Sequence, residues 1–268
     1  ASPTHHYFIR DMVLDYEIRL REKGFDPADM EAVKKATSDP SYPIRNYAIR
    51  LLAARKGKEA LPVLTKALDD PSQMVRCSAA TLLAVFGDKG GLNRMHKDLV
   101  DFTPKESVAD INQSTDMDDR QKLEAKRQRR LQLKDAIAAA KVLAEFGDHR
   151  GYDLAVQVIM SDESAIRKAE AVEILSFISN SNLEVLRAEN HDPDAVLLAL
   201  AETAHEGVVV TTLSGSALIH RRPDVGMRIL ETLSRAPQAS EDQRKDVERS
   251  LKYLKQKIHK VGQDGTKK

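Results

Sequence analysis

Several residue types that mark other classes of protein are scarce in this chain of 268 residues. It contains no Trp, six Phe and six Tyr, and an aromatic share of 4% is small for a ligand pocket, because such pockets are usually lined by aromatic and apolar side chains. The one cysteine, Cys77, excludes an internal disulfide and a metal cluster built on cysteines. No run approaches about 18 apolar residues, so we expect no membrane span.

Net charge of one sign is also lacking, since 42 basic residues face 41 acidic ones and leave a formal charge of +1. Binding to a polyanion would therefore depend on a local basic patch. The sequence begins at Ala1 and shows no signal peptide, which favours the cytoplasm and leaves an extracytoplasmic location after signal cleavage open. Composition leaves the oligomeric state open.

A repeat with a period of 31 residues dominates residues 39–100. The tripeptide Asp-Pro-Ser at 39–41 returns at 70–72, and a fixed period of this length is the signature of a repeat architecture. Neither helix pair can bury its apolar side alone, so neighbouring repeats must stack. The other recurring segments are Ile44-Arg45 with Val75-Arg76, Leu51-Leu52-Ala53 with Leu82-Leu83-Ala84, and Leu61 with Leu92.

Apolar residues at helical spacing predict an all-α fold, a superhelix of paired helices with one extended charged helix inserted mid-chain. We expect a single α-solenoid domain over residues 1–268. Its segments are capping helices (1–37), two clear repeats (38–101), a loop and an extended basic helix (102–134), two further repeats (135–190), divergent helices (191–260) and a disordered tail (261–268).

Two short helices are expected before the first repeat. The first spans residues 7–23 and ends at Gly24, a helix-capping residue. Asp26 as N-cap and Pro27 at the first helical position predict a second helix up to about Thr37. The apolar stripe of the first helix consists of Phe8, Met12, Leu14 and Ile18.

The repeat pattern is interrupted in the middle of the chain. Residues 101–115 include Pro104 and predict a loop. Thr115 or Asp116 is the expected cap of a helix over residues 117–146, which contain neither Pro nor Gly. Such a helix would be about 45 Å long. The end of this helix and the two residues after it, 143–148, resemble 83–88 and indicate that the repeat resumes there.

Shorter helices are expected in the rest of the chain. Residues 207–212 have a strand-like composition, but we predict a helix there because Leu213, Ala217 and Leu218 continue its apolar stripe. The other expected helices cover residues 152–160, a reopened repeat after 161, 183–187, 192–204, 223–235 and 241–258.

The repeated segments resemble the HEAT-repeat family, closest to its short bacterial or phycobilin-lyase-like form. The resemblance rests on the Asp-Pro entry, the Val-Arg or Ile-Arg pair that follows, the Ala/Leu stripe and a Gly-Asp turn. It implies an α-solenoid and a hydrogen-bonded ladder between neighbouring repeats, because a bidentate Arg–carboxylate pair fixes orientation. The residues that match the ladder are Asp39 with Arg45, Asp70 with Arg76, and Asp162 with Arg167. Asp135 departs from the pattern, since an apolar residue is expected there.

A basic run, residues 120–134, is the most unusual feature of the chain. Seven cations against one acid, Glu124, give it a net charge of +6. Charge runs are usually solvated helix faces, and the functional alternative is an arm that docks an acidic protein surface or phosphates. We expect partner contacts from Lys126, Arg127, Arg129, Arg130 and Lys134 on this arm, and from Arg94 and Lys97 in a groove formed by residues 59–68, 92–100 and 152–160.

No constellation of catalytic, cofactor-binding or metal-binding residues is visible. The histidines show no i, i+4 pairing and no nearby cysteine. The Ser-Gly-Ser at 214–216 lacks the frame of a nucleophile turn. We therefore expect a non-enzymatic protein-binding scaffold. The alternatives are a nucleic-acid-binding protein, disfavoured because no aromatic residue lies in the basic run, and a lyase-like enzyme subunit, suggested by the repeat type alone.

Overall fold

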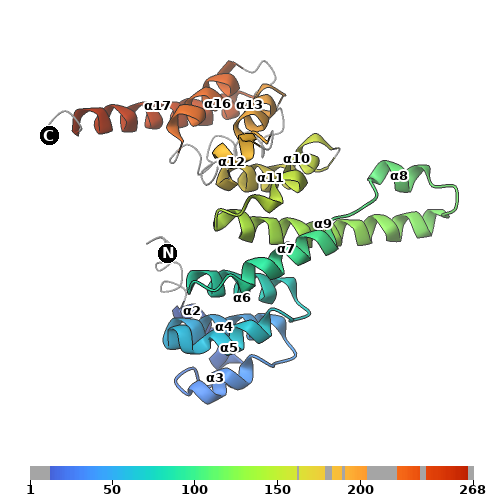
Figure 1. Cartoon of the computed structure of the whole chain (residues 1–268), viewed down its shortest axis with the longest axis vertical. Helices are drawn as coiled ribbons and strands as arrows, with labels where there is room; N and C mark the ends of the chain where they lie inside the picture. Colours follow the sequence, from blue (N-terminus) through green and yellow to red (C-terminus); the bar gives the residue numbers. More distant parts are fainter. Residues whose placement is uncertain are drawn as a thin grey trace. The chain divides into compact units, whose positions relative to one another are not determined.

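The computed structural model describes residues 13–161, 163–178, 183–188, 191–203, 222–235 and 240–264. Every element in these ranges is a helix, which confirms the all-α fold class (Figure 1). Contacts between Cα atoms divide the chain into two compact units, Ala1–Val142 and Leu143–Lys268. Each unit has its own buried core of Leu, Ile, Val and Ala side chains.

The first unit begins with α2 (Val13–Glu22) and α3 (Met30–Ala36). The expected stripe of α2 is wrong in its described half: Leu14 and Ile18 are exposed, and Tyr16 and Leu20 are buried instead. Phe8 and Met12 lie outside the described residues. The helix packs against α4, so the side that carries Tyr16 faces the repeats.

The expected cap of the second helix is also wrong. The Asp26 carboxylate accepts from the Ala28 amide at 2.9 Å and forms a turn. The N-cap of α3 is Asp29, whose carboxylate accepts from the Glu31 amide at 2.9 Å. Two aspartates three residues apart offer the same capping chemistry, and the helix starts at the second.

Two repeats form the centre of this unit. The first consists of α4 (Tyr42–Lys56), the 3₁₀ turn η1 (Gly57–Ala60) and α5 (Leu61–Ala67). The second consists of α6 (Gln73–Val85) and α7 (Gly90–Phe102), so equivalent helices start 31 residues apart, at 42 and 73. The predicted stripes are buried, with α4 packed on α6 and α5 on α6 (Figure 1). Their members include Ile44, Ala48, Leu51, Leu52, Val75, Ala79, Leu82 and Leu83.

An inserted hairpin follows the second repeat. The expected loop over residues 101–115 is wrong in part, because it contains the short helix α8 (Val108–Gln113). A capping box starts α8: the Ser107 hydroxyl accepts from the Asp110 amide at 3.0 Å, and the Asp110 carboxylate accepts from the Ser107 amide at 2.8 Å. Ile111 anchors the short helix, being almost fully buried.

The extended helix is α9 (Asp119–Glu145), 27 residues long. Its cap is Asp118 rather than Thr115 or Asp116. The Asp118 carboxylate accepts from the Gln121 amide, and the Gln121 side chain accepts from the Asp118 amide, both at 2.8 Å. After the helix, Gly147 takes a positive φ of 77°, as Gly87 does at 88°. The same carbonyl-to-amide pattern closes both turns, so the repeat does resume at the end of α9.

The second unit contains seven helical elements among its described residues. They are η2 (His149–Gly151), α10 (Tyr152–Met160), α11 (Ala165–Ile178), α12 (Leu183–Ala188), α13 (Pro193–Thr203), α16 (Pro223–Arg235) and α17 (Glu241–Asp264). Among the described helices, α10 packs on α11, α13 on α16 and α16 on α17. The buried carboxylate of Asp194 at the start of α13 accepts from Arg187 at 3.2 Å and from Arg222 at 3.0 Å, and so links α13 to both neighbours.

The expected end of the last helix needs correction. α17 continues to Asp264, so residues 261–264 are helical rather than part of a disordered tail. The predictions for residues 207–218 and for 265–268 fall outside the described residues. Within the described ranges, no helix has the length and apolarity that crossing a membrane requires.

Candidate functional site

A polar ladder joins the first repeat to the second. The Arg45 guanidinium donates from Nε and Nη2 to both carboxylate oxygens of Asp70, each at 2.7 Å. Its Nη1 donates to the backbone carbonyls of Asp39 at 2.8 Å and Pro40 at 2.9 Å. Arg45 therefore holds the Asp-Pro turn of its own repeat and the carboxylate of the next.

Charge and burial shift the pKa values of Asp70 and Arg45 in opposite directions. Burial would raise the pKa of Asp70, but the hydrogen bonds and charge of Arg45 outweigh it and hold the pKa below its usual value. The hydrogen bond to Asp70 raises the pKa of Arg45 in turn. Both groups stay ionised at neutral pH, so the rung is a charge-assisted bidentate pair.

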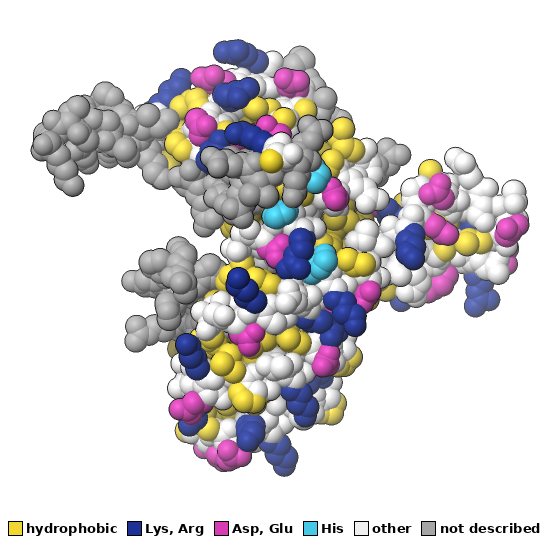
Figure 2. Space-filling model, in the orientation of Figure 1, with side chains coloured by type: hydrophobic (Ala, Val, Ile, Leu, Met, Phe, Trp, Pro, Cys, Tyr) yellow, Lys and Arg dark blue, Asp and Glu magenta, His cyan; other side chains and the backbone are white. Residues whose placement is uncertain are grey.

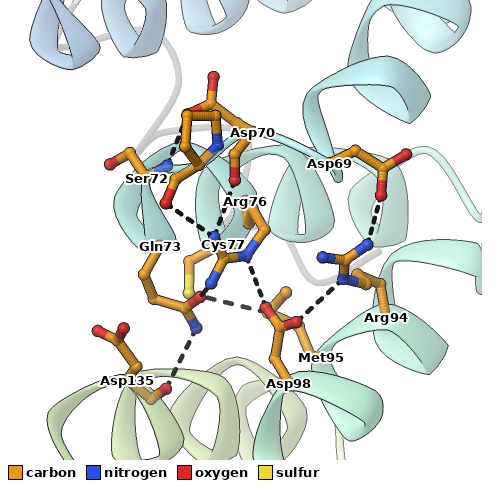
Figure 3. A network of polar contacts seen from close by, with 11 residues as sticks. Asp69, Asp70, Ser72, Gln73, Arg76, Cys77, Arg94, Met95, Asp98 and Asp135 are labelled. Atoms are coloured by element: carbon orange, nitrogen blue, oxygen red, sulfur yellow. Dashed lines mark hydrogen bonds and ion pairs between the residues drawn. The ribbon is translucent and has the colours of Figure 1, made fainter. Parts of the chain in front are cut away.

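The second rung begins in the same way and ends differently (Figure 3). Arg76 Nη1 donates to the carbonyls of Asp70 at 2.8 Å and Pro71 at 3.1 Å, as Arg45 does one repeat earlier. Its Nε donates to Asp98 in α7 at 2.8 Å, and its Nη2 bonds the side chain of Gln73. Both Arg76 and Asp98 are buried. The carboxylate that accepts from Arg76 thus comes from the same repeat, and no sequence pattern indicated Asp98.

Asp135 lies beside the second rung, on α9 (Figure 3). Gln73 Nε2 donates to the backbone carbonyl of Asp135 at 3.1 Å and so joins α6 to α9. Burial raises the pKa of the Asp135 carboxyl, and the charge of Arg76 offsets only part of that effect. The departure of Asp135 from the repeat pattern therefore puts an acid in a position that disfavours its ionised form.

The third expected rung is only half described. Asp162 lies outside the described residues. Arg167 donates to Glu170 on the next turn of α11 at 2.6 Å. Glu170 occupies a position that is apolar in the second repeat.

The two expected groove residues of α7 have different surroundings. Arg94 Nε donates to Asp98 at 3.0 Å, and its Nη1 bonds the Asp69 carboxylate, so Arg94 belongs to the buried network (Figure 3). Lys97 is exposed. The expected groove combines α5 and α7 of the first unit with α10 of the second, and it stays a prediction.

One face of α9 holds α8 and the segment before it. Arg129 Nε donates to the Glu106 carbonyl at 2.8 Å, and Lys122 Nζ donates to the Asn112 carbonyl at 3.1 Å. Lys126 is half-buried on the same side. These cations of the basic run therefore help to close the hairpin, a use that the sequence did not indicate.

The opposite face of α9 is exposed. Leu123 is 69% exposed and Leu131 is 48% exposed, which is high for large apolar side chains. The Arg127 side chain is 73% exposed, with one long contact of 3.8 Å to Glu124. At 100° per residue these positions share one side of the helix. This outer face consists of Arg120, Leu123, Glu124, Arg127, Arg130, Leu131 and Lys134, all exposed.

A shallow cavity of about 260 Å³ lies where the hairpin joins the second repeat. Its lining mixes acids, bases and amides and includes Asp101, Glu106 and Arg129. No group of three or more His, Cys, Asp or Glu that could hold a metal ion occurs among the described residues. Nothing in this cavity assembles a nucleophile with a base.

Residues 30–109 match a family model described as HEAT repeats. No curated protein and no solved structure matches the chain. The matched segment runs from α3 to the start of α8 and contains both complete repeats and both rungs of the ladder. The residues between Asp39 and Asp88 that carried the resemblance lie within it, whereas Asp162 and Arg167 lie beyond it. Residues 30–109 of the chain are therefore assigned to HEAT repeats.

Proposed function

We propose that this protein is a non-enzymatic scaffold that binds an acidic surface of a protein partner through the outer face of α9. HEAT repeats commonly serve as protein-interaction scaffolds, and the family is generally non-enzymatic. The observation that carries the proposal is the composition of that outer face. It presents two exposed leucines among four cations and one acid.

The charge of this face is local. Figure 2 shows basic and acidic side chains interspersed over the visible surface, in keeping with a formal charge of +1 for the whole chain. The outer face of α9 carries Arg120, Arg127, Arg130 and Lys134 against Glu124, a net charge of +3. Arginine suits such a role because its guanidinium pairs bidentately with carboxylates.

The exposed leucines favour a protein over a nucleic acid as the partner. Leu123 and Leu131 lie two turns apart and present apolar surface that phosphates cannot bury. No aromatic side chain lies between Phe102 and Phe146 to stack on bases. The partner surface that fits carries acidic groups interspersed with apolar contacts, because Arg127 lies between Leu123 and Leu131 on this face.

The test is a capture experiment from native extract, with and without nuclease. We compare the natural chain with an Arg120→Gln, Arg127→Gln, Arg130→Gln variant. The matched control is Arg21→Gln, Lys252→Gln, Lys255→Gln, which removes the same charge from exposed positions elsewhere. A captured protein identified by mass spectrometry is then purified and titrated against all three chains.

We expect the α9 variant to bind the partner about 3- to 150-fold more weakly, from three exposed ion pairs of about 0.2–1 kcal/mol each. The control should bind within about twofold of the natural chain. Equal losses in both variants would contradict the role of the α9 face. If capture disappears with nuclease, the scaffold proposal is wrong and the protein binds nucleic acid instead.

A further inference from the structure

The second helices of three consecutive repeats share one register. Val33 in α3, Leu64 in α5 and Met95 in α7 are 31 residues apart, and each is fully buried. α3 packs against α4 as α5 packs against α6. Positions that differ by 31 therefore occupy the same place in successive repeats, and α3 belongs to this series.

A row of three lysines follows from this register. Lys35, Lys66 and Lys97 each stand two positions after the buried residue, and each is exposed. Two positions turn an α-helix by about 200°, so the lysines face away from the core. One lysine per repeat thus lies on the solvent side of α3, α5 and α7.

Helix stability alone does not account for the third lysine. Lys35 and Lys66 lie in the last turns of short helices, where a cation interacts favourably with the helix dipole. α7 is longer and continues to Phe102, so Lys97 lies before its last turn. Lys97 therefore occupies the same repeat position as Lys66, although α7 extends further beyond that position than α5 does.

Apart from Asp98, which is buried and bonded by Arg76 and Arg94, the acids of the same helices lie toward the helix ends. Glu31 is in the first turn of α3, and Asp101 is in the last turn of α7. Asp69, just after α5, is already bonded by Arg94. The middle of the row is therefore positive, although the whole molecule is almost neutral.

We propose that the row Lys35, Lys66 and Lys97 binds an extended acidic peptide segment that crosses α3, α5 and α7. α2 packs on α4 and α4 on α6, so equivalent positions of successive repeats are displaced by about 10 Å, and an extended chain advances about 3.3 Å per residue. One carboxylate at about every third residue of the peptide therefore meets one lysine per repeat. This site is separate from the α9 face and does not depend on it.

The test measures binding of two dye-labelled peptides to the full chain by fluorescence anisotropy. One peptide of about twelve residues repeats Glu-Ser-Gly, and the other has the same composition with its glutamates contiguous. Low ionic strength, about 20 mM, keeps the Debye length near 20 Å. The row variant is Lys35→Gln, Lys66→Gln, Lys97→Gln. The matched control is Lys23→Gln, Lys56→Gln, Lys105→Gln, three exposed lysines outside the row.

We expect the repeating peptide to bind more tightly than the contiguous one, by about threefold or more. The row variant should weaken that binding about 5- to 50-fold, and the control by less than about twofold. Equal affinity for the two peptides, or equal losses in the two variants, would show that only bulk charge is sensed and would overturn the proposal. Failure of the repeating peptide to saturate the protein at about millimolar concentration would also overturn it.

Discussion

Arg45 and Arg76 occupy equivalent positions and bind carboxylates from different places. Arg45 takes Asp70 of the next repeat, and Arg76 takes Asp98 of its own. The residue one period after Asp70 is Asp101, which lies exposed in the last turn of α7. Because α7 is longer than α5, no turn brings Asp101 back to Arg76, and an acid inside the helix replaces it.

The environment of Asp135 leads to a pH-dependent prediction. Burial raises its pKa in the folded state above the usual value of 3.8. An acid with a raised folded pKa contributes stability that is fully present below the unfolded pKa and is lost as pH rises through the folded pKa. At neutral pH the ionised carboxylate therefore costs stability. We expect Asp135→Asn to raise the free energy of unfolding at pH 7 by less than about 1 kcal/mol, measured by urea denaturation.

Asp70 supplies a control, because its pKa is shifted in the opposite direction to that of Asp135. Arg45 outweighs the effect of burial and lowers the pKa of Asp70, so its contribution is present above the unfolded pKa and is lost as pH falls through the folded pKa. Asp70→Asn should destabilise the protein at pH 7, with a smaller effect near pH 3. A stability of Asp135→Asn that equals or falls below that of the natural chain at pH 7 would contradict the assignment for Asp135.

At the scale of single helices, sequence patterns predicted interiors better than ends. The bounds of α10 and α16 agree with the expected 152–160 and 223–235, because Gly, Pro and capping residues flank them. The start of α3 was misplaced because Asp26 and Asp29 can both cap. α8 was missed because six residues are too few for a periodic pattern, although Ser107 and Asp110 form a capping box.

The two faces of α9 could not be separated from the sequence. The run of cations is obvious, but only the position of α8 decides which cations are used internally. Arg129 and Lys122 bind carbonyls of the α8 segment, and Arg127 and Arg130 stay exposed. Every residue has a backbone carbonyl, so a hydrogen bond to one does not depend on the type of the acceptor residue and cannot be predicted from the sequence.

The packing of α6 on α7 gives a prediction about two adjacent glycines. A Cβ on Gly91 would lie 2.7 Å from the Cα and carbonyl oxygen of Ala80, which is backbone and cannot move aside. A Cβ on Gly90 would meet only the Asp88 side chain, at 3.0 Å. Helix propensity alone would make both Gly→Ala changes stabilising, by up to about 1 kcal/mol.

We therefore expect the two substitutions to change the free energy of unfolding by different amounts or in opposite directions. Gly91→Ala should destabilise the protein by about 1–3 kcal/mol, because α7 must move away from α6. Gly90→Ala should change stability by less than about 1 kcal/mol. Thermal unfolding followed by circular dichroism separates them. Similar melting temperatures for the two variants would mean that α6 and α7 are packed less closely than the structure shows.

At the scale of the molecule, the 31-residue period predicted the repeats, their apolar stripes and the arginines of the ladder. It could not predict which face of α9 stays exposed or the choice of Asp98, because both depend on the insertion that breaks the period. The lysine row has the same period, but only the structure shows that α3 is the second helix of a repeat and that Lys35 therefore belongs to the row. The sequence at the start of α3 does not resemble that of the later repeats.

Repeat architectures couple each repeat mainly to its neighbours, and this gives a prediction for the whole chain. Arg76→Ala leaves the Asp98 carboxylate buried with Arg94 as its remaining cation, so we expect a loss of about 3 kcal/mol. The loss of protection against hydrogen exchange should be greatest in α6 and α7 and smaller in α4, which packs on α6. The helices α16 and α17 pack on each other and should keep their protection.

Hydrogen exchange read by mass spectrometry measures this distribution in one experiment. The control is Asp69→Ala, which removes the other carboxylate bound to Arg94. Asp69 is 79% exposed, so that change should cost less than about 0.5 kcal/mol and leave the exchange pattern intact. Faster exchange that falls off with each helix away from Arg76 is what nearest-neighbour coupling requires. Equal acceleration in α6 and α17 would instead mean that the chain unfolds as one cooperative body, because a buried charge in one repeat would then destabilise every helix alike.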